Sequence, residues 1–501
     1  MTGTRRSNIT LEGNSVRRLN YRPFLIMIFF GIVYSSVSLV NHILFRTYAL
    51  DLGMFNQALH SFSRFRQAIF TLDIEGGELT YFATHFSPIS FLYVPFYYLF
   101  GSYTLLIIQI LAILGGGYGI FRYSLISTGN RTLSHIVMIF FFGIWGIYSA
   151  LSFDFHNNVV GAMLLPWFIY FLRRGKRWSC LIIFSLILMC QENMALWMVF
   201  ITAGLLFLPG FKGKRERIFI ASLLISSFIW FIIVMQIIGP ALNPDRANQL
   251  SRYSHLGGSL PAIVLNIVGH PLQTARLLFA NILEDEIYSG IKRELHLMVL
   301  LSGGIALIFR PQYLIMLIPV YAQKLFANDY ALWGINYQYS IEFAPVLALA
   351  MVDTLSLIRK PVLKLAIMIM VTLVTYISTF SVTESRISKW YTRVNARFYS
   401  AEHYRTNIDI ISVRRAIRLV PDNVPVSVNS ELAPHLARRQ KLYHFPIIKD
   451  AEYILLLQGN RSTYPLTEKE YREMITELRN SSEYLIENDD PDILILKVRK
   501  D

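Results

Sequence analysis

Five ionisable side chains stand where apolar runs begin or end, and their types could support acid–base chemistry. They are Asp51, His85, Asp154, His156 and Glu192. A carboxylate at the water edge of a cavity can act as a general base. Charge next to long apolar segments is costly, so it tends to be kept for a function. We therefore take Asp51 as the candidate catalytic group and the other four as candidate substrate-binding residues.

Most of these side chains also have a structural interpretation. Asp51 stands directly before a predicted amphipathic helix, so its carboxylate could cap that helix instead of acting as a base. His85 lies among aromatic residues, where a lone histidine is more often a hydrogen-bonded structural group. Asp154 and His156 could satisfy helix ends within a tight turn. For Glu192 we favour the functional interpretation, because a carboxylate within a membrane span usually marks a functional site.

The elements that must position these residues are membrane-spanning helices. The chain has 501 residues, 54% hydrophobic and only 16% charged, with a mean hydropathy of +0.43. Soluble proteins carry roughly 25% charge. Apolar runs of about 17–25 residues recur along the chain, which is typical of a polytopic helical membrane protein. This excludes an ordinary cytosolic enzyme, a disordered protein and a nucleic-acid-binding domain, so no nucleic-acid partner is expected.

Basic loops predict the topology of these spans. The net charge is +14, and the strongest basic loops cover 173–177 and 212–217. Lys and Arg gather in cytoplasmic loops, which places residues 1–22 in a cytoplasmic tail and the C-terminus outside a plasma or inner membrane. The outer surfaces are then 46–102, 152–157, 241–293 and 327–339. About eleven spans are predicted within 23–381, at 23–45, 103–121, 132–151, 158–172, 178–190, 194–209, 218–240, 295–309, 312–326, 340–358 and 362–381.

The apolar segment 84–100 does not fit this topology as a full span, because one more crossing would move basic loops to the outer side. It is short and contains Pro88 and Pro95. Irregular backbone at membrane depth is tolerated where protein or a water-filled cavity surrounds it. We therefore interpret it as a re-entrant or interfacial helix on the outer side. The alternative is a real short span, with the basic pair Arg122 and Arg131 on the wrong side.

The tail from about residue 382 changes composition from apolar to mixed. Short β-like runs at 424–428, 453–457 and 493–498 alternate with helical stretches at 403–419, 431–439 and 467–479. That alternation predicts a small α/β domain. The fold class is thus an all-α transmembrane bundle with an extracytoplasmic α/β domain over 382–501.

Other polar groups fall on the same outer surfaces. Arg64 and Arg252 could hold a phosphate, although outer basic residues more often meet lipid headgroups. Tyr337 and Tyr339 open the tenth span, in which Glu342 is a further costly carboxylate. The sequence has no Walker A signature, dinucleotide fingerprint or HExxH helix.

The order of these motifs resembles a family of predicted multi-pass membrane proteins of unknown function. The resemblance extends over nearly the whole chain. That family is similar to the type C (GT-C) glycosyltransferases, which use lipid-phosphate sugars outside the membrane. The resemblance is carried by Asp51-Leu-Gly53-x-Phe55-x-Gln57, His85-Phe-Ser-Pro88, Phe153-Asp154-Phe-His156, Glu192, Tyr337-x-Tyr339 with Pro345, Pro434-His435 with Arg438-Arg439, and Tyr443-x-Phe445-Pro446.

In GT-C enzymes an acidic residue of the first outer loop is the usual catalytic group, and Asp51 matches that position. Those enzymes often carry two adjacent acidic residues there, whereas Leu50 and Leu52 flank Asp51. No cofactor is therefore assigned, and a divalent metal ion stays an open alternative.

Two functions follow as hypotheses. The first is a glycosyltransferase in which Asp51 accepts a proton from an acceptor hydroxyl, with a polyprenyl-phosphate-linked sugar as donor and membrane lipids as neighbours. The tail domain would then help to bind the acceptor. The second is a transporter or lipid flippase in which Glu192 and Glu342 relay protons. Carboxylates near the outer surface favour the transferase, and carboxylates near the bilayer midplane favour transport.

Overall fold

The computed structural model describes residues 21–211, 213–243, 249–382, 393–459 and 461–499. The predicted cytoplasmic tail lies almost wholly outside this range. So do Lys212 of one basic loop and the first residues of the predicted tail domain after 382.

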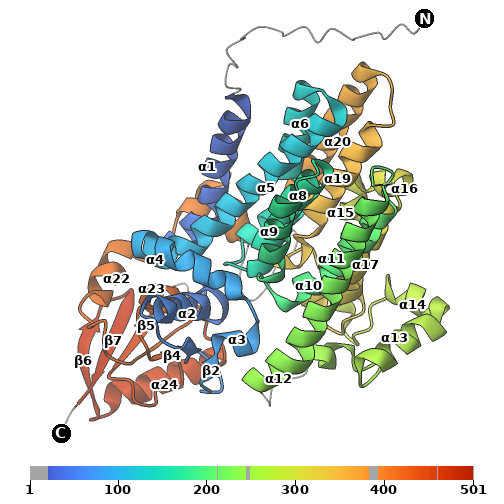
Figure 1. The fold of residues 1–501 in the computed structure, drawn as a ribbon. Coiled ribbons are helices and arrows are strands. Elements are labelled where there is room, and N and C mark those ends of the chain that lie inside the picture. Colours follow the sequence, from blue (N-terminus) through green and yellow to red (C-terminus); the bar gives the residue numbers. More distant parts are fainter. Residues whose placement is uncertain (1–20, 212, 244–248, 383–392, 460, 500–501) are drawn as a thin grey trace, which may run out of the picture.

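The apolar runs form helices, because a backbone inside lipid must satisfy its polar groups internally. In Figure 1 these helices make one bundle, and the N-terminal end of α1 lies at the end of the bundle away from the sheet. The helices of the bundle are α1 (Arg22–Ile43), α5 (Thr104–Thr128), α6 (Arg131–Phe142), α7 (Trp145–Leu151), α8 (Asn157–Arg173), α9 (Arg177–Leu188), α10 (Glu192–Leu206), α11 (Lys214–Ile233), α15 (Ile291–Val299), α16 (Ala306–Phe309), α17 (Gln312–Leu325), α19 (Phe343–Leu355) and α20 (Pro361–Val382).

Four helical stretches are long and apolar enough to cross a membrane: Arg22–Ile43, Pro88–Thr128, Lys214–Leu242 and Pro361–Val382. The pair α6 and α7, bent by 46°, would make a fifth. A helix lies over each of the eleven predicted apolar segments. Most of these helices are shorter than the roughly 20 residues that a span needs, so the count of eleven stays a prediction.

Shorter elements gather at the end of the bundle that carries the sheet. A short helical turn, η2 (Pro88–Tyr93), leads into α4 (Val94–Phe100), and Gly101 with a φ of +53° turns the chain into α5. α4 packs on α2 and lies across this end of the bundle in Figure 1. The remaining helices are α2 (Met54–Ser63), α3 (Tyr81–Thr84), α12 (Gly239–Leu242), α13 (Leu260–Gly269), α14 (Pro271–Leu277), α18 (Tyr330–Trp333), α21 (Arg393–Ala396), α22 (Ile410–Ile417), α23 (Ala433–Leu436) and α24 (Glu468–Asn480).

A five-stranded mixed sheet occupies the C-terminal part of the chain, next to a two-stranded ribbon of β1 (Ile69–Phe70) and β2 (Leu79–Thr80). Its strand order is β4-β3-β5-β7-β6, with β4, β3 and β5 parallel and β7 antiparallel to both of its neighbours. The strands are β3 (Val426–Val428), β4 (Leu442–His444), β5 (Tyr453–Leu457), β6 (Tyr484–Asp489) and β7 (Ile493–Val498). β3, β5 and β7 lie within the three β-like runs, whereas β4 and β6 were not predicted.

Alternating side chains of β5 decide what covers each face of the sheet, because successive residues of a strand point to opposite sides. Leu455 and Leu457 join a cluster that includes α22, α23, Phe45 and Ala49. Ile454 and Leu456 join a cluster with residues of α24. The first face therefore packs on the segment that follows α1, which contains Phe45 and Ala49. This packing places the sheet next to the turn that contains Asp51.

Candidate functional site

Asp51 lies in a π-helical turn, η1 (Ala49–Gly53), between α1 and α2. α2 begins at Met54, its N-cap is Gly53, and no side chain caps it. The structural interpretation of Asp51 as a helix cap is therefore wrong, since the extra turn moves the helix start past it. The Asp51 side chain keeps 30% of its surface exposed, so its carboxylate can reach a ligand from water.

His156 faces this carboxylate from the loop between α7 and α8. Its Nε2 lies 3.3 Å from Oδ1 of Asp51. Gln109 of α5 fixes the loop, because its Nε2 donates to the carbonyl oxygen of Asp154 at 2.9 Å and its Oε1 accepts from the amide of His156 at 3.0 Å. A single buried amide side chain thus sets the position of the imidazole opposite Asp51.

Aromatic rings surround the imidazole. Phe153 stacks on His156 with centroids 5.5 Å apart and an interplanar angle of 12°, and Tyr337 meets Phe153 edge-on at 4.7 Å. Asp154 and Tyr337 both have positive φ, +38° and +63°. Such backbone costs about 1–3 kcal/mol per residue and clusters at functional sites. Both residues with strained backbone therefore lie beside Phe153: Asp154 follows it in the chain, and the ring of Tyr337 packs on its ring.

Asp154 is a second carboxyl group beside Asp51. Its Oδ2 accepts a hydrogen bond of 3.0 Å from the amide of Tyr48, and the side chain is buried. Burial, and then the charge of Asp51, raise the pKa of Asp154 well above its usual range. The two carboxyl groups therefore have different environments, with Asp51 open to water and Asp154 buried.

Tyr339 connects Asp51 to a cation. Burial, and then the charge of Asp51, raise the pKa of this tyrosine to about 12. The nearby Arg252 lowers the pKa of Tyr339 in turn, and its Nε lies 3.6 Å from Oδ2 of Asp329. Arg252 is half exposed, so its guanidinium can also meet a ligand at the site.

A second polar cluster contains His85 and Glu192. Nδ1 of His85 lies 3.0 Å from Oε1 of Glu192, and the amide of Phe86 donates to Oε2 at 3.1 Å. Glu192 is the first residue of α10 and is buried, whereas the His85 side chain is 38% exposed.

One aromatic layer separates this second cluster from Asp51 and His156. The hydroxyl of Tyr81 accepts a hydrogen bond of 3.0 Å from Nδ2 of Asn157, and Glu192 is near enough for its charge to act on this hydroxyl. Phe55 bridges the layer, with its ring 5.8 Å from that of Tyr81 and 6.3 Å from that of His156. The predicted carboxylates and histidines therefore form two neighbouring groups at one end of the bundle.

Residues 41–495 match one family of proteins, described as predicted membrane protein (DUF2079). The chain belongs to this family. The matched range of the DUF2079 protein includes η1, the loop that carries Asp154 and His156, and the C-terminal sheet up to the first residues of β7. No curated protein matches it in sequence.

Solved structures similar to the DUF2079 protein include two distant ones. The Archaeoglobus fulgidus oligosaccharyltransferase in its apo form is 11% identical, with a TM-score of 0.47, 94% of this chain covered and 70% of that chain. ArnT from Cupriavidus metallidurans, bound to undecaprenyl phosphate, is 10% identical, with a TM-score of 0.47, 95% of this chain covered and 98% of that one.

Of the predicted site residues of the DUF2079 protein, Arg64 lies apart from the rest. It is the exposed C-cap residue of α2, about 15 Å along the helix from the end that meets η1. Its charge acts on His60 and Tyr97. The distance follows from the helix itself, which carries the chain away from Asp51.

Several residues at this site were not predicted from the sequence. Gln109, Phe153 and Tyr48 position the loop and the turn, and Ser430 accepts a hydrogen bond of 3.1 Å on Oγ from the amide of Ala49. Ser430 follows β3, and a polar residue after a predicted strand is the one signal that could have indicated it. Among the described residues, no group of three or more His, Cys, Asp or Glu side chains is placed to hold a metal ion.

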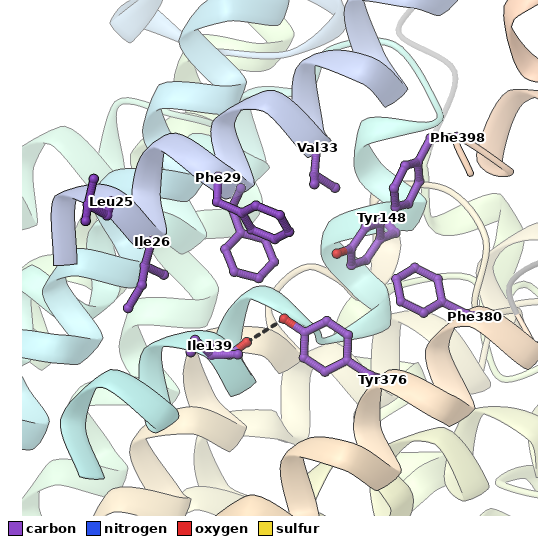
Figure 2. A pocket seen from close by; sticks show the side chains of 10 residues that line it. Leu25, Ile26, Phe29, Val33, Ile139, Tyr148, Tyr376, Phe380 and Phe398 are labelled. Carbon is purple, nitrogen blue, oxygen red and sulfur yellow. Dashed lines mark hydrogen bonds between the residues drawn. The ribbon is translucent and has the colours of Figure 1, made fainter. Parts of the chain in front are cut away.

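An apolar groove of about 570 Å³ runs along α1. Figure 2 shows its walls, which come from α1, the bent pair α6 and α7, α20, and Phe398. The hydroxyl of Tyr376 donates to the carbonyl oxygen of Ile139 at 2.8 Å, so no free donor faces the groove from that ring. Its lining is Leu25, Ile26, Phe29, Phe30, Val33, Ile139, Tyr148, Tyr376, Phe380 and Phe398.

Proposed function

We propose that this DUF2079 protein transfers a sugar from a polyprenyl-phosphate donor to an acceptor hydroxyl, with Asp51 as the general base. The supporting observation is the Asp51 carboxylate, open to water and fixed by His156 at 3.3 Å. The resemblance to GT-C glycosyltransferases adds the substrate class. The site is assigned to the extracytoplasmic side, at the bundle end that carries the sheet and lies away from the N-terminal end of α1 (Figure 1).

The reaction is a displacement at the anomeric carbon. The acceptor oxygen forms a bond to this carbon while its proton passes to the Asp51 carboxylate. The bond between the anomeric carbon and the phosphate oxygen breaks, and its electron pair leaves with the polyprenyl phosphate. Arg252 offsets the charge that develops on that phosphate.

The neighbours of Asp51 orient its carboxyl group. A carboxylate can only accept, so a proton carried on Nε2 of His156, 3.3 Å away, would interact favourably with Asp51. Asp154 is buried, and its raised pKa disfavours a second negative charge at the site. His85 and Glu192, one aromatic layer away, are assigned to sugar binding.

The apolar groove along α1 is assigned to the lipid chain of the donor. α7 contributes Tyr148 to the groove and then leads into the loop of Asp154 and His156. A lipid chain in the groove would therefore lie along the helix that carries the site loop. About eleven spans, with an extracytoplasmic domain over 382–501, complete the proposed architecture.

A transporter or flippase is the alternative, and one observation favours it. Glu192 and Glu342 are both buried carboxyl groups in the bundle, and Glu342 accepts from Nδ2 of Asn158 at 3.1 Å. Transport needs such groups to exchange protons across the bilayer midplane. Asp51 and Asp154, by contrast, lie together at the bundle end next to the sheet, which favours the transferase.

The test is transfer by Asp51→Asn, measured on the purified full chain with a radiolabelled polyprenyl-phosphate sugar. We expect activity to fall by about 10²–10⁴-fold, the usual contribution of a general base. Glu75→Gln, an exposed carboxyl group of the same outer loop, is the matched control and should retain activity. Full transfer by Asp51→Asn would remove the proposed function.

A further inference from the structure

The C-terminal sheet contains a topological switch point. β3 is followed in sequence by β4 on one side, and the chain then crosses to β5 on the other side, with all three strands parallel. Their carboxyl ends therefore meet at one edge. In open α/β sheets ligands bind in the crevice outside the carboxyl ends at such a point.

Buried polar atoms without hydrogen-bond partners gather at this edge. They follow β3, end β4 or follow β5, and Asn429, Glu431 and His444 expose 3%, 3% and 0% of their surface. An unpartnered buried polar group costs about 1–3 kcal/mol, so six such atoms at one edge mark it as a candidate binding site. The six are Asn429 Nδ2, Glu431 Oε2, His444 Nδ1, His444 Nε2, Gln458 Nε2 and Arg461 Nε.

The segment after β5 holds these groups together. The amide of Ser462 donates to Oε1 of Glu431, and the ring of Tyr464 lies 6.4 Å from that of His444. Oδ1 of Asn429 accepts from the amide of Leu457 at 3.2 Å, which leaves its amide nitrogen as the unused donor. The unpartnered atoms thus come from elements that are fixed to one another.

This edge adjoins the turn that carries Asp51. Oγ of Ser430 accepts from the amide of Ala49 at 3.1 Å. The amide of the preceding residue, Tyr48, donates to Oδ2 of Asp154 at 3.0 Å, and burial, then the carboxyl groups of Glu431 and Asp154, raise the pKa of its phenol. The sheet edge and the proposed catalytic carboxylate are therefore parts of one continuous polar region.

The unused atoms are mixed in type. The amide nitrogens of Asn429 and Gln458 and Nε of Arg461 donate, Glu431 Oε2 is a carboxyl oxygen that can accept, and a neutral His444 ring has one donor and one acceptor nitrogen. Hydroxyl groups both donate and accept, so a neutral ring with several hydroxyls satisfies this set. Tyr464 adds an aromatic face, which suits the apolar side of a sugar ring.

We propose that the carboxyl edge of β3, β4 and β5 binds a sugar ring, and that this ring belongs to the acceptor of the reaction at Asp51. The second half of this proposal rests on the proposed function. The acceptor would bind with one ring at the sheet edge and present a hydroxyl to Asp51.

Binding is tested without any donor, so the result does not depend on transfer. The full chain in lipid nanodiscs is probed by saturation-transfer NMR with the methyl α-glycosides of glucose, galactose and mannose. We expect a signal from at least one glycoside, lost in His444→Leu and in Gln458→Met but kept in Glu473→Gln, an exposed residue of α24. Absence of signal for all three, or signals unchanged in both variants, would overturn the proposal.

Melting temperature separates a ligand site from a buried water site. His403 is the matched control, because it is as buried as His444 but its two nitrogens bond to the carbonyl oxygens of Val394 and Ser36 at 2.6 and 2.7 Å. We expect His403→Leu to lower the melting temperature and His444→Leu to keep or raise it. Equal losses in both would mean that water satisfies His444, and the site would fall.

Failure of this site and failure of the proposed function give different results. If Asp51→Asn abolishes transfer while His444→Leu leaves the KM for the acceptor unchanged, the transferase stands and the acceptor site falls. If the glycoside binds at His444 while the wild-type chain transfers no sugar, the assignment of the ring to an acceptor falls with the transferase. A raised acceptor KM in His444→Leu, with kcat kept, supports both.

Discussion

Nε2 of His156 lies 3.3 Å from Oδ1 of Asp51, although Asp51 lies between α1 and α2 and His156 lies in the loop between α7 and α8. The imidazole is held from the other side by stacking on Phe153. Its remaining nitrogen, Nδ1, is buried and makes no hydrogen bond to the described part of the chain. Within the described part of the chain, the polar side-chain contact of this ring is thus its approach to the carboxylate of the catalytic candidate.

Replacing His156 should distinguish the role of its Nε2 proton beside Asp51 from the role of its ring stacked on Phe153. His156→Phe keeps a ring against Phe153 but removes the donor to Asp51, and we expect kcat to fall by about 10–100-fold, the weight of a charge-assisted hydrogen bond of ~1.5–3 kcal/mol. His156→Gln restores a donor at a similar reach and should recover part of kcat. Steady-state kinetics with a labelled donor measure both variants, and equal activity in the two would refute a positioning role.

Asp154→Asn should be tolerated far better than Asp51→Asn. Burial and the charge of Asp51 raise the pKa of Asp154, so an amide resembles the protonated form already present. We expect a loss of less than about tenfold in kcat/KM, well below the general-base contribution at Asp51. Comparable losses in the two variants would mean that Asp154, and not Asp51 alone, carries the reaction.

Asp154 should also make stability depend on pH. A carboxyl group with a raised folded-state pKa binds a proton in the folded chain where the unfolded chain has lost it, so stability falls as pH rises above the ordinary carboxyl range. The dependence ends once pH exceeds the raised value. Asp154→Asn should flatten this part of the plot of melting temperature against pH. An unchanged slope would contradict a raised pKa at Asp154.

Much of the fold could be predicted from local patterns. Apolar runs gave the positions of helices, and β5 and β7 coincide with predicted strands, because several consecutive apolar residues suffice to indicate a buried strand. β4 and β6 were missed for opposite reasons. β4 is only three residues long and ends in His444, while β6 mixes charged and apolar residues along an exposed sheet edge.

The site was less predictable than the fold. Asp51, Asp154 and His156 could be singled out because charge is scarce in the chain, but their pairing depends on Gln109, an uncharged residue inside an apolar helix. Arg64 was proposed as a phosphate ligand because the predicted topology put it on the same outer surface as Asp51, but α2 separates the two residues in space. Glu431 comes from the far end of the chain, and no local pattern connects it with Tyr48.

Filling the apolar groove should discriminate between donors by chain length. Val33 lines the groove, whereas its neighbour Ile32 is exposed on the outside of α1. We expect Val33→Trp to raise KM for a long polyprenyl donor by about tenfold, because about 1.4 kcal/mol of apolar contact is lost, and to leave KM for a short-chain analogue unchanged. Ile32→Trp is the control. An equal effect on both donors would place the lipid chain elsewhere.

Glu431 should make the sheet edge more stable at low pH than at high pH. Burial raises its pKa from 4.5 to about 7. Between these values the folded chain holds a proton that the unfolded chain has released, so stability falls as pH rises from about 4.5 to 7 and levels off above that. The full effect is on the order of 3 kcal/mol.

Glu431→Gln carries no such charge, so its melting temperature should match the wild type near pH 5 and exceed it at pH 8. Glu473→Gln, exposed on α24, should follow the wild type at both. A Glu431→Gln variant that melts below the wild type at pH 8 would mean that the carboxylate is paired and ionised there.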